Sequence, residues 1–186
     1  MKKRWRIIVG STLLAILLIG LIPYMIVSSP HAIHLEKTIE APAEVVFASI
    51  EDVRNWPAWA WPWTEDPDAE VMWYDKTTGE MAGFFWNSSS EKINSGVVEL
   101  RNVNPPKDIQ CVVVPEAEEP YPLDIKITLI TDSTSKVELI RSLPAGNLPW
   151  ERIRFWSDLP KLKKDQKKQL DGLAAFLTTE TDSITQ

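Results

Sequence analysis

The chain has 186 residues, of which 44% are hydrophobic and 25% charged, enough for one domain of ordinary size and an additional segment. It contains 20 Lys and Arg and 26 Asp and Glu, for a formal net charge of −6. Four basic residues lie within the first six positions, so everything after them has 16 basic and 26 acidic residues and a net charge of −10. This balance argues against nucleic acid and against anionic lipid as general partners, because phosphates need a basic surface.

An uncharged and mostly apolar run occupies residues 7–27. As a helix it would be about 32 Å long, enough to cross a bilayer core. We therefore predict a basic cytoplasmic N-terminus at 1–6, a transmembrane anchor at 7–27 and a linker at 28–32. The alternative is a cleaved signal peptide, but its apolar core would be about 7–15 residues, and Pro30 lies beside the best cleavage site.

The basic residues before the run determine the predicted orientation. They are Lys2, Lys3, Arg4 and Arg6, and no acidic residue precedes the run. The positive-inside rule then predicts a single-pass membrane protein whose C-terminal domain lies outside the cytoplasm, periplasmic or extracellular.

The next elements are a strand and two short helices. Ile33, Leu35 and Ile39 alternate with polar residues, which predicts a strand. Pro42 suits the first position of a helix, and apolar residues follow it at helical spacing. Asn55-Trp56-Pro57 ends this helix, because the residue before a proline avoids the helical region.

Six further short apolar segments alternate with turns rich in Pro, Gly, Asn, Asp and Ser, and we predict each of them as a strand. They cover residues 71–74, 80–86, 96–103, 109–114, 123–129 and 137–140. Because short turns join most of them, we expect antiparallel neighbours.

The last predicted element is a long helix, Leu159 to Leu177, with Pro160 in its first turn. Its apolar stripe follows steps of three and four residues: Leu162, Gln166, Leu170, Leu173 and Leu177. Residues 179–186 are polar and are expected to form a flexible tail.

The order of these elements carries a resemblance to a known family. Ile39-Glu40-Ala41-Pro42, Val45-Val46-Phe47, Ile50-Glu51-Asp52 and Trp56-Pro57-Ala58-Trp59 resemble the opening of the polyketide cyclase/dehydrase and lipid-transport group of the START-like (Bet v 1-like, SRPBCC) superfamily. Later landmarks match its bacterial membrane-anchored members: Trp61-Pro62-Trp63, Asp66-Pro67, Thr78-Gly79, Trp86, Ser95-Gly96, Asn104-Pro105 and Gly172-Leu173.

The resemblance covers residues 33–178 and implies an α+β helix-grip fold. In that fold a curved seven-stranded antiparallel sheet surrounds a long C-terminal helix, and two short helices follow strand 1. It also implies an apolar cavity between the sheet and the long helix. Its expected lining residues are Trp59, Trp61, Trp73, Trp86, Val98, Leu100, Leu173 and Phe176. A filled core would use the same residue types, so the pattern alone does not distinguish the two.

Few residues support catalysis or metal binding. His31 and His34 lie at the start of the domain, which argues against a histidine-dependent triad or metal site, and we expect no metal and no cofactor. Cys111 is the only cysteine and is expected to be a buried structural thiol. Glu99 and Arg101 share one strand face, where an exposed pair is favoured over a charged patch inside a cavity. Carboxylates in the loops, such as Glu116 and Glu119, are expected to be solvated.

Three functions remain open at this stage. The favoured one is a membrane-anchored START-like domain that binds an apolar small molecule or lipid outside the cytoplasm, without a catalytic constellation. The second is a cyclase or dehydratase type of enzyme, for which only Glu99, Arg101 or Tyr74 offers a charged or titratable group. The third is a non-catalytic structural or interaction module with a filled core. The expected partners are the membrane, through the N-terminal helix, and a hydrophobic small molecule or lipid.

Overall fold

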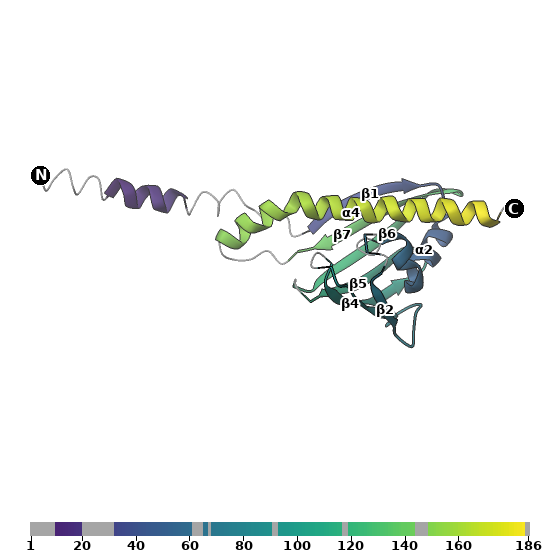
Figure 1. Cartoon of the computed structure of the whole chain (residues 1–186). Coiled ribbons are helices and arrows are strands. Elements are labelled where there is room, and N and C mark those ends of the chain that lie inside the picture. The colour runs from purple at the N-terminus through teal and green to yellow at the C-terminus, as the bar shows by residue number, and fades with distance from the viewer. Residues whose placement is uncertain are drawn as a thin grey trace, which may run out of the picture. The chain divides into compact units, whose positions relative to one another are not determined.

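The computed structural model describes the chain except for residues 1–9, 20–31, 61–64, 67, 91–92, 117–118, 144–148 and 185–186. Of residues 149–155 and 180–184 it describes the backbone only. The chain divides into two compact units, Met1–His31 with Ala145–Pro160 and Ala32–Pro144 with Lys161–Gln186. The second unit holds the sheet and is drawn with its strands labelled in Figure 1.

The predicted membrane span is not supported by the structure. Within it, residues 10–19 are helical, whereas residues 7–9 and 20–27 lie outside the described part of the chain. A helix of that described extent is about 15 Å long, roughly half of a bilayer core. Among the described residues, no helix is long and apolar enough to cross a membrane. The prediction of a single-pass membrane protein is therefore contradicted.

The sheet of the second unit has seven strands in the order β1-β7-β6-β5-β4-β3-β2, and every neighbouring pair is antiparallel. This confirms the predicted seven-stranded antiparallel sheet. The strands are β1 (Ala32–Ile39), β2 (Glu70–Trp73), β3 (Gly83–Asn87), β4 (Ser95–Asn104), β5 (Asp108–Pro115), β6 (Tyr121–Thr131) and β7 (Thr134–Ser142).

Period-two alternation explains which side of the sheet is buried. On β6, Leu123, Ile125 and Ile127 are buried and alternate with more exposed residues. On β4, Val98 and Leu100 are fully buried. These side chains share the face that we call the inner face. The buried leucines of α4 belong to the same hydrophobic core, and α4 runs beside β1 and β7 in Figure 1.

Two short helices follow β1, as predicted. The first is α2 (Ala43–Glu51), which begins directly after Pro42 and buries one apolar side. A 3₁₀ turn, η1 (Val53–Asn55), leads from it into α3 (Trp56–Trp59). This geometry places Trp56 and Trp59 at the inner face of the sheet, where both are buried.

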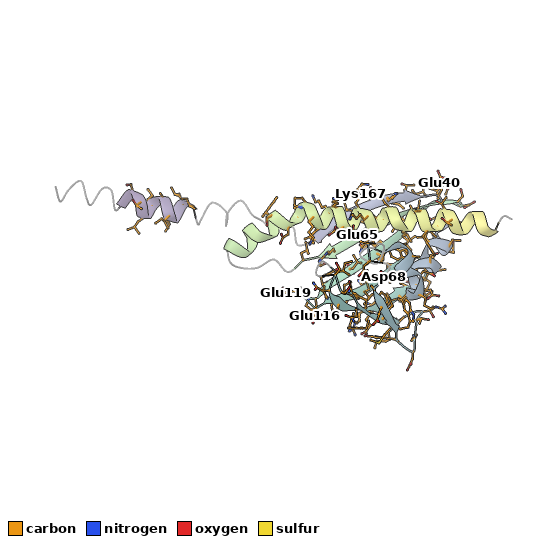
Figure 2. The ribbon with its side chains drawn as sticks, viewed as in Figure 1. Glu40, Glu65, Asp68, Glu116, Glu119 and Lys167 are labelled. Atoms are coloured by element: carbon orange, nitrogen blue, oxygen red, sulfur yellow. The ribbon has the colours of Figure 1, made fainter. Side chains whose placement is uncertain are left out.

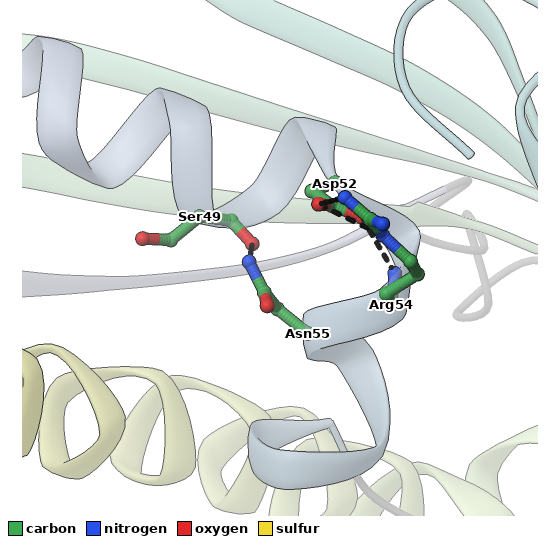
Figure 3. A network of polar contacts seen from close by, with 4 residues as sticks. All are labelled: Ser49, Asp52, Arg54 and Asn55. Atoms are coloured by element: carbon green, nitrogen blue, oxygen red, sulfur yellow. Dashed lines mark hydrogen bonds and ion pairs between the residues drawn. The ribbon is translucent and has the colours of Figure 1, made fainter.

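A polar network holds the turn between α2 and α3 (Figure 3). The Asp52 carboxylate accepts a hydrogen bond from the Arg54 backbone N–H at 3.0 Å and pairs with the Arg54 guanidinium at 2.5 Å. The side-chain amide of Asn55 donates to the Ser49 carbonyl oxygen at 3.3 Å. Hydrogen bonding to Arg54 also holds the pKa of Asp52 below its ordinary value of 3.8.

The long helix α4 (Pro149–Ile184) starts earlier and ends later than the predicted Leu159 to Leu177. Pro160 lies inside it rather than in its first turn. At the other end, the hydroxyl groups of Thr178 and Thr179 donate to the carbonyl oxygens one turn earlier, at 2.9 and 3.0 Å. These bonds satisfy the polar side chains within the helix, so α4 continues into the residues predicted to be a tail.

Candidate ligand-binding site between the sheet and α4

An aromatic wall covers part of the inner face, and the strand register explains it. Residues directly opposite each other in antiparallel strands point to the same side of a sheet. Trp73 of β2 lies opposite Phe84 of β3, Phe84 lies opposite Val98 of β4, and Trp86 of β3 lies opposite Gly96. A side chain at Gly96 would clash with the Trp86 indole, so this glycine makes the room in which the ring lies.

The short helix α3 extends this wall. The Trp56 and Trp59 ring centroids are 5.2 Å apart, and Trp56 lies 6.2 Å from Phe84. Phe84 in turn lies 5.3 Å from Trp73 and 6.4 Å from Trp86. Each spacing is within the range of favourable aromatic contacts. We call these five residues, Trp56, Trp59, Trp73, Phe84 and Trp86, the aromatic wall.

Helix α4 closes the site on the other side. Leu170, Leu173 and Leu177 are buried, as the predicted apolar stripe requires. Gly172 allows α4 to pack closely against α3, because a Cβ at this position would clash with the backbone carbonyl of Trp59. An ion pair between Lys37 of β1 and Asp171 of α4, at 2.5 Å, ties the helix to the edge of the sheet.

Two side chains in this interior have buried polar atoms without a hydrogen-bond partner. Trp56 is satisfied, since its indole N–H donates to the Ile50 carbonyl oxygen at 2.8 Å. In contrast, the indole N–H of Trp59 and both amide atoms of Gln166 have no partner among the described residues. Trp59 is 3% exposed and Gln166 2%. Buried groups of this kind are uncommon in folded proteins, because each loses its hydration without compensation.

Two charged side chains lie in the same interior. Arg141 of β7 and Asp165 of α4 are each 8% exposed, and the Arg141 guanidinium lies 3.5 Å from the centre of the Tyr121 ring. Burial raises the pKa of Asp165 above its ordinary value, and the positive charges of Lys161, Lys168 and Arg141 oppose this rise while Glu65 adds to it. We call Arg141, Asp165 and Gln166 the polar cluster.

The structure brings most of the predicted ligand-binding residues together. Trp59, Trp86, Val98, Leu100 and Leu173 are all buried in the interior, and the half-buried Phe176 packs against the same core. Their role in binding a ligand stays a prediction.

Trp73 and Trp61 differ from the other predicted lining residues. Trp73 is 40% exposed on the edge strand, where it also lines a surface hollow of about 450 Å³ together with Tyr74 and Met81. Trp61 lies outside the described residues.

The groups considered for catalysis do not enter this interior. Glu99 and Arg101 alternate with the buried Val98 and Leu100, so they lie on the outer face, where they form an ion pair at 3.0 Å. The exposed pair expected from the sequence is found only in part, since the Arg101 side chain is 52% exposed and the Glu99 side chain 17%. Tyr74 is 37% exposed beyond the end of β2.

Cys111 is buried and two carboxylates of the connection between β5 and β6 are exposed, as the sequence predicts. Cys111 is buried, and burial raises the pKa of its thiol, which confirms the expected unreactive environment. Glu116 and Glu119 are exposed in the connection between β5 and β6. Figure 2 shows that both lie away from Lys167 of α4. No group of three or more His, Cys, Asp or Glu in the described part of the chain could hold a metal ion.

The polar cluster was missed as a site at the sequence level, although its members carry signals. Gln166 is the one polar member of the apolar stripe of α4. Arg141 follows Val137 and Leu139 at a period of two, which places it on the inner face of β7. Whether these polar groups find partners depends on tertiary packing, which periodicity does not report.

Comparison with known proteins identifies the fold. No family model matches the chain, and neither does any curated protein. Among solved structures, the Ms6760 protein of Mycobacterium smegmatis is 13% identical with a TM-score of 0.56, covering 81% of this chain and 92% of that one. CalU16 of Micromonospora echinospora is 15% identical with a TM-score of 0.53, covering 82% of this chain and 80% of that one.

A third similar structure is DynU16, described as a protein of the dynemicin biosynthetic locus. It is 14% identical with a TM-score of 0.58, and the match covers 82% of this chain and 49% of DynU16. At these identities a structural likeness concerns the fold alone. The chain shares the fold of these proteins, which agrees with the helix-grip, polyketide cyclase-like fold that the sequence resemblance implies.

Proposed function

We propose that the chain binds an apolar small molecule between the inner face of the sheet and α4, against the aromatic wall. The observation that carries this proposal is the burial of the Trp59 indole N–H and the Gln166 amide without hydrogen-bond partners among the described residues. Each such group costs about 1–3 kcal/mol when it is left unpaired. A bound molecule with oxygen or nitrogen atoms would pair with them and recover this free energy.

The surroundings of these groups suit such a ligand. Small-molecule sites are mainly apolar and aromatic, with a few polar groups that set the orientation of the ligand. The aromatic wall and the leucines of α4 supply the apolar surface, and Trp59 and Gln166 supply the polar groups. A filled structural core explains the apolar residues equally well, but it gives no reason to bury three polar atoms that have no partner among the described residues.

The proposal is tested with the full chain and the neutral fluorescent probe N-phenyl-1-naphthylamine. We expect a saturable rise in probe fluorescence with a stoichiometry of one, and displacement of the probe by molecules extracted from the purified protein and identified by native mass spectrometry. An empty protein that shows no saturable uptake of the probe would refute the proposal.

A matched pair of substitutions locates the site. Trp59→Leu removes a buried member of the aromatic wall, whereas Trp156→Leu removes a tryptophan of α4 that is 46% exposed. Trp59→Leu should weaken probe binding about tenfold, which corresponds to the loss of one or two good contacts at 1.4 kcal/mol per factor of ten. Trp156→Leu should leave the affinity unchanged. Equal effects of the two substitutions would place the probe elsewhere.

A further inference from the structure

The members of the polar cluster come from two elements, α4 and β7, and its two charged members interact electrostatically. Gln166 precedes the buried Leu170 by one helical turn, so it lies on the face of α4 that is turned toward the sheet. Arg141 lies on the inner face of β7, two residues after the buried Leu139. Asp165 is adjacent to Gln166 and interacts electrostatically with Arg141.

The two buried charges of this cluster, on Arg141 and Asp165, are opposite in sign. The charged groups that act on Asp165 are Lys161 and Lys168 of α4, Glu65 of the connection before β2, and Arg141 of β7. Lys168 is itself paired with Glu65. Within the cluster, the positive charge of Arg141 is therefore opposed by the carboxyl group of Asp165. An additional anion would therefore lose its hydration on entry without a buried positive charge left unopposed to compensate it.

The chemistry of Gln166 narrows the choice of ligand further. Its side chain offers two N–H donors and one carbonyl acceptor, and neither amide atom has a partner within the described structure. A group that both donates and accepts hydrogen bonds satisfies both atoms, whereas an ether, a ketone or a carboxylate only accepts. A primary amide offers both functions in one plane, and a hydroxyl group offers them on one oxygen.

We propose that the polar cluster is the head-group subsite of the ligand site and that it selects an uncharged carboxamide or hydroxyl group over a carboxylate. Gln166 pairs with the head group, while Asp165 keeps anions away by opposing the charge of Arg141. The apolar body of the ligand then lies against the aromatic wall. This inference rests on the proposed function.

Four naphthalenes with the same apolar body separate head-group recognition from general binding. These probes are 2-naphthamide, 2-naphthol, 2-naphthoate and 2-methylnaphthalene, each measured by displacement of N-phenyl-1-naphthylamine from the full chain. The amide and the alcohol should bind about tenfold more tightly than the methyl compound, as expected for one or two hydrogen bonds to a buried amide. The carboxylate should bind more weakly than either.

Substitutions in the cluster test the role of each group through affinity ratios. Gln166→Met should bring the ratio of naphthamide to methylnaphthalene affinity close to one. Asp165→Asn should raise the ratio of naphthoate to naphthamide affinity about tenfold, because the charge of Arg141 is then unopposed. Asp158→Asn changes an exposed aspartate of the same helix and should leave both ratios as they are.

The outcomes distinguish this inference from the proposed function. If the fluorescent probe binds but the four naphthalenes bind equally, or the carboxylate binds best, the head-group assignment is wrong and the proposed function stands. If Gln166→Met retains the full preference for the amide, the assignment is wrong as well. If no probe binds, both the proposed function and this inference fail.

Discussion

Replacing Gln166 with methionine should make the ligand-free protein more stable. Methionine has a similar length and helix propensity, fills irregular interior space and has no strong hydrogen-bonding group to satisfy. Gln166 is only 2% exposed, and both of its amide atoms lack a partner among the described residues. Removing this unpaired polar group should raise the free energy of unfolding by about 1–3 kcal/mol.

The measurement is urea denaturation of the full chain, followed by tryptophan fluorescence and by circular dichroism. The midpoint should move to higher urea at an unchanged slope, since a constant slope means that the surface exposed on unfolding is the same. The melting temperature should rise by roughly 2–4 °C for each kcal/mol in a chain of this size. Gln169→Met is the matched control, because Gln169 is half-buried on the same helix and makes interactions of its own. It should not stabilise the protein.

A loss of stability in Gln166→Met of more than about 1 kcal/mol would refute the reasoning, because it would show that the amide is satisfied in the ligand-free protein. An equal gain in Gln166→Met and Gln169→Met would refute it too. The gain would then come from helix propensity or general hydrophobicity rather than from an unpaired interior amide.

Three further predictions follow from the same interior. Burial raises the folded-state pKa of Asp165 above 3.8, so the free energy of unfolding should fall as pH rises from 3.8 through that raised pKa. Asp165→Asn should remove this fall in urea titrations between pH 3.5 and 7. If the variant and the unmodified protein showed the same pH dependence of the unfolding free energy, the assignment of the fall to Asp165 would be contradicted. Gly172→Ala should destabilise the protein by about 1–3 kcal/mol despite better helix propensity, because the new methyl group overlaps the Trp59 carbonyl, and a rise in melting temperature would show that α4 does not pack this closely. The buried Cys111 thiol should react with a thiol reagent only at the rate of unfolding, so rapid labelling of the native protein would be inconsistent with its environment.

The sheet could be predicted from the sequence because its strands carry a local signal. Leu123, Ile125 and Ile127 alternate with polar residues, and turn residues separate the strands, so each strand is recognisable by itself. All seven strands occur with antiparallel neighbours. The order of the strands was not predicted, since pairing β1 with β7 joins residues about 100 positions apart and no local pattern encodes it.

The extent of α4 could not be predicted in the same way. Pro160 was interpreted as a first-turn residue, the position that proline prefers, but it lies inside the helix. Proline in a helix interior is unfavourable on local grounds and is tolerated only where the surrounding structure compensates. The polar residues near the C-terminus were likewise judged by composition, whereas Thr178 and Thr179 bond to the helix backbone.

The site was predictable in its apolar part and not in its polar part. Trp59 and Leu173 were expected to line the interior because of the family resemblance, and both are buried. Asp165, Gln166 and Arg141 are residue types that are usually exposed, so their burial depends on how α4 is placed over β7. That placement is a property of the fold and not of any one segment.

The indole N–H resonance of Trp59 offers the most direct measurement of ligand binding in the interior. In a ¹⁵N-labelled sample of the full chain, comparison with Trp59→Leu and Trp156→Leu assigns the two signals. During titration with N-phenyl-1-naphthylamine, the Trp59 resonance should shift saturably while the Trp156 resonance stays in place. Of the two side chains, Trp59 is the buried one, and its indole N–H has no partner among the described residues. If the probe saturates and the Trp59 resonance does not move, the space between the sheet and α4 is not the binding site.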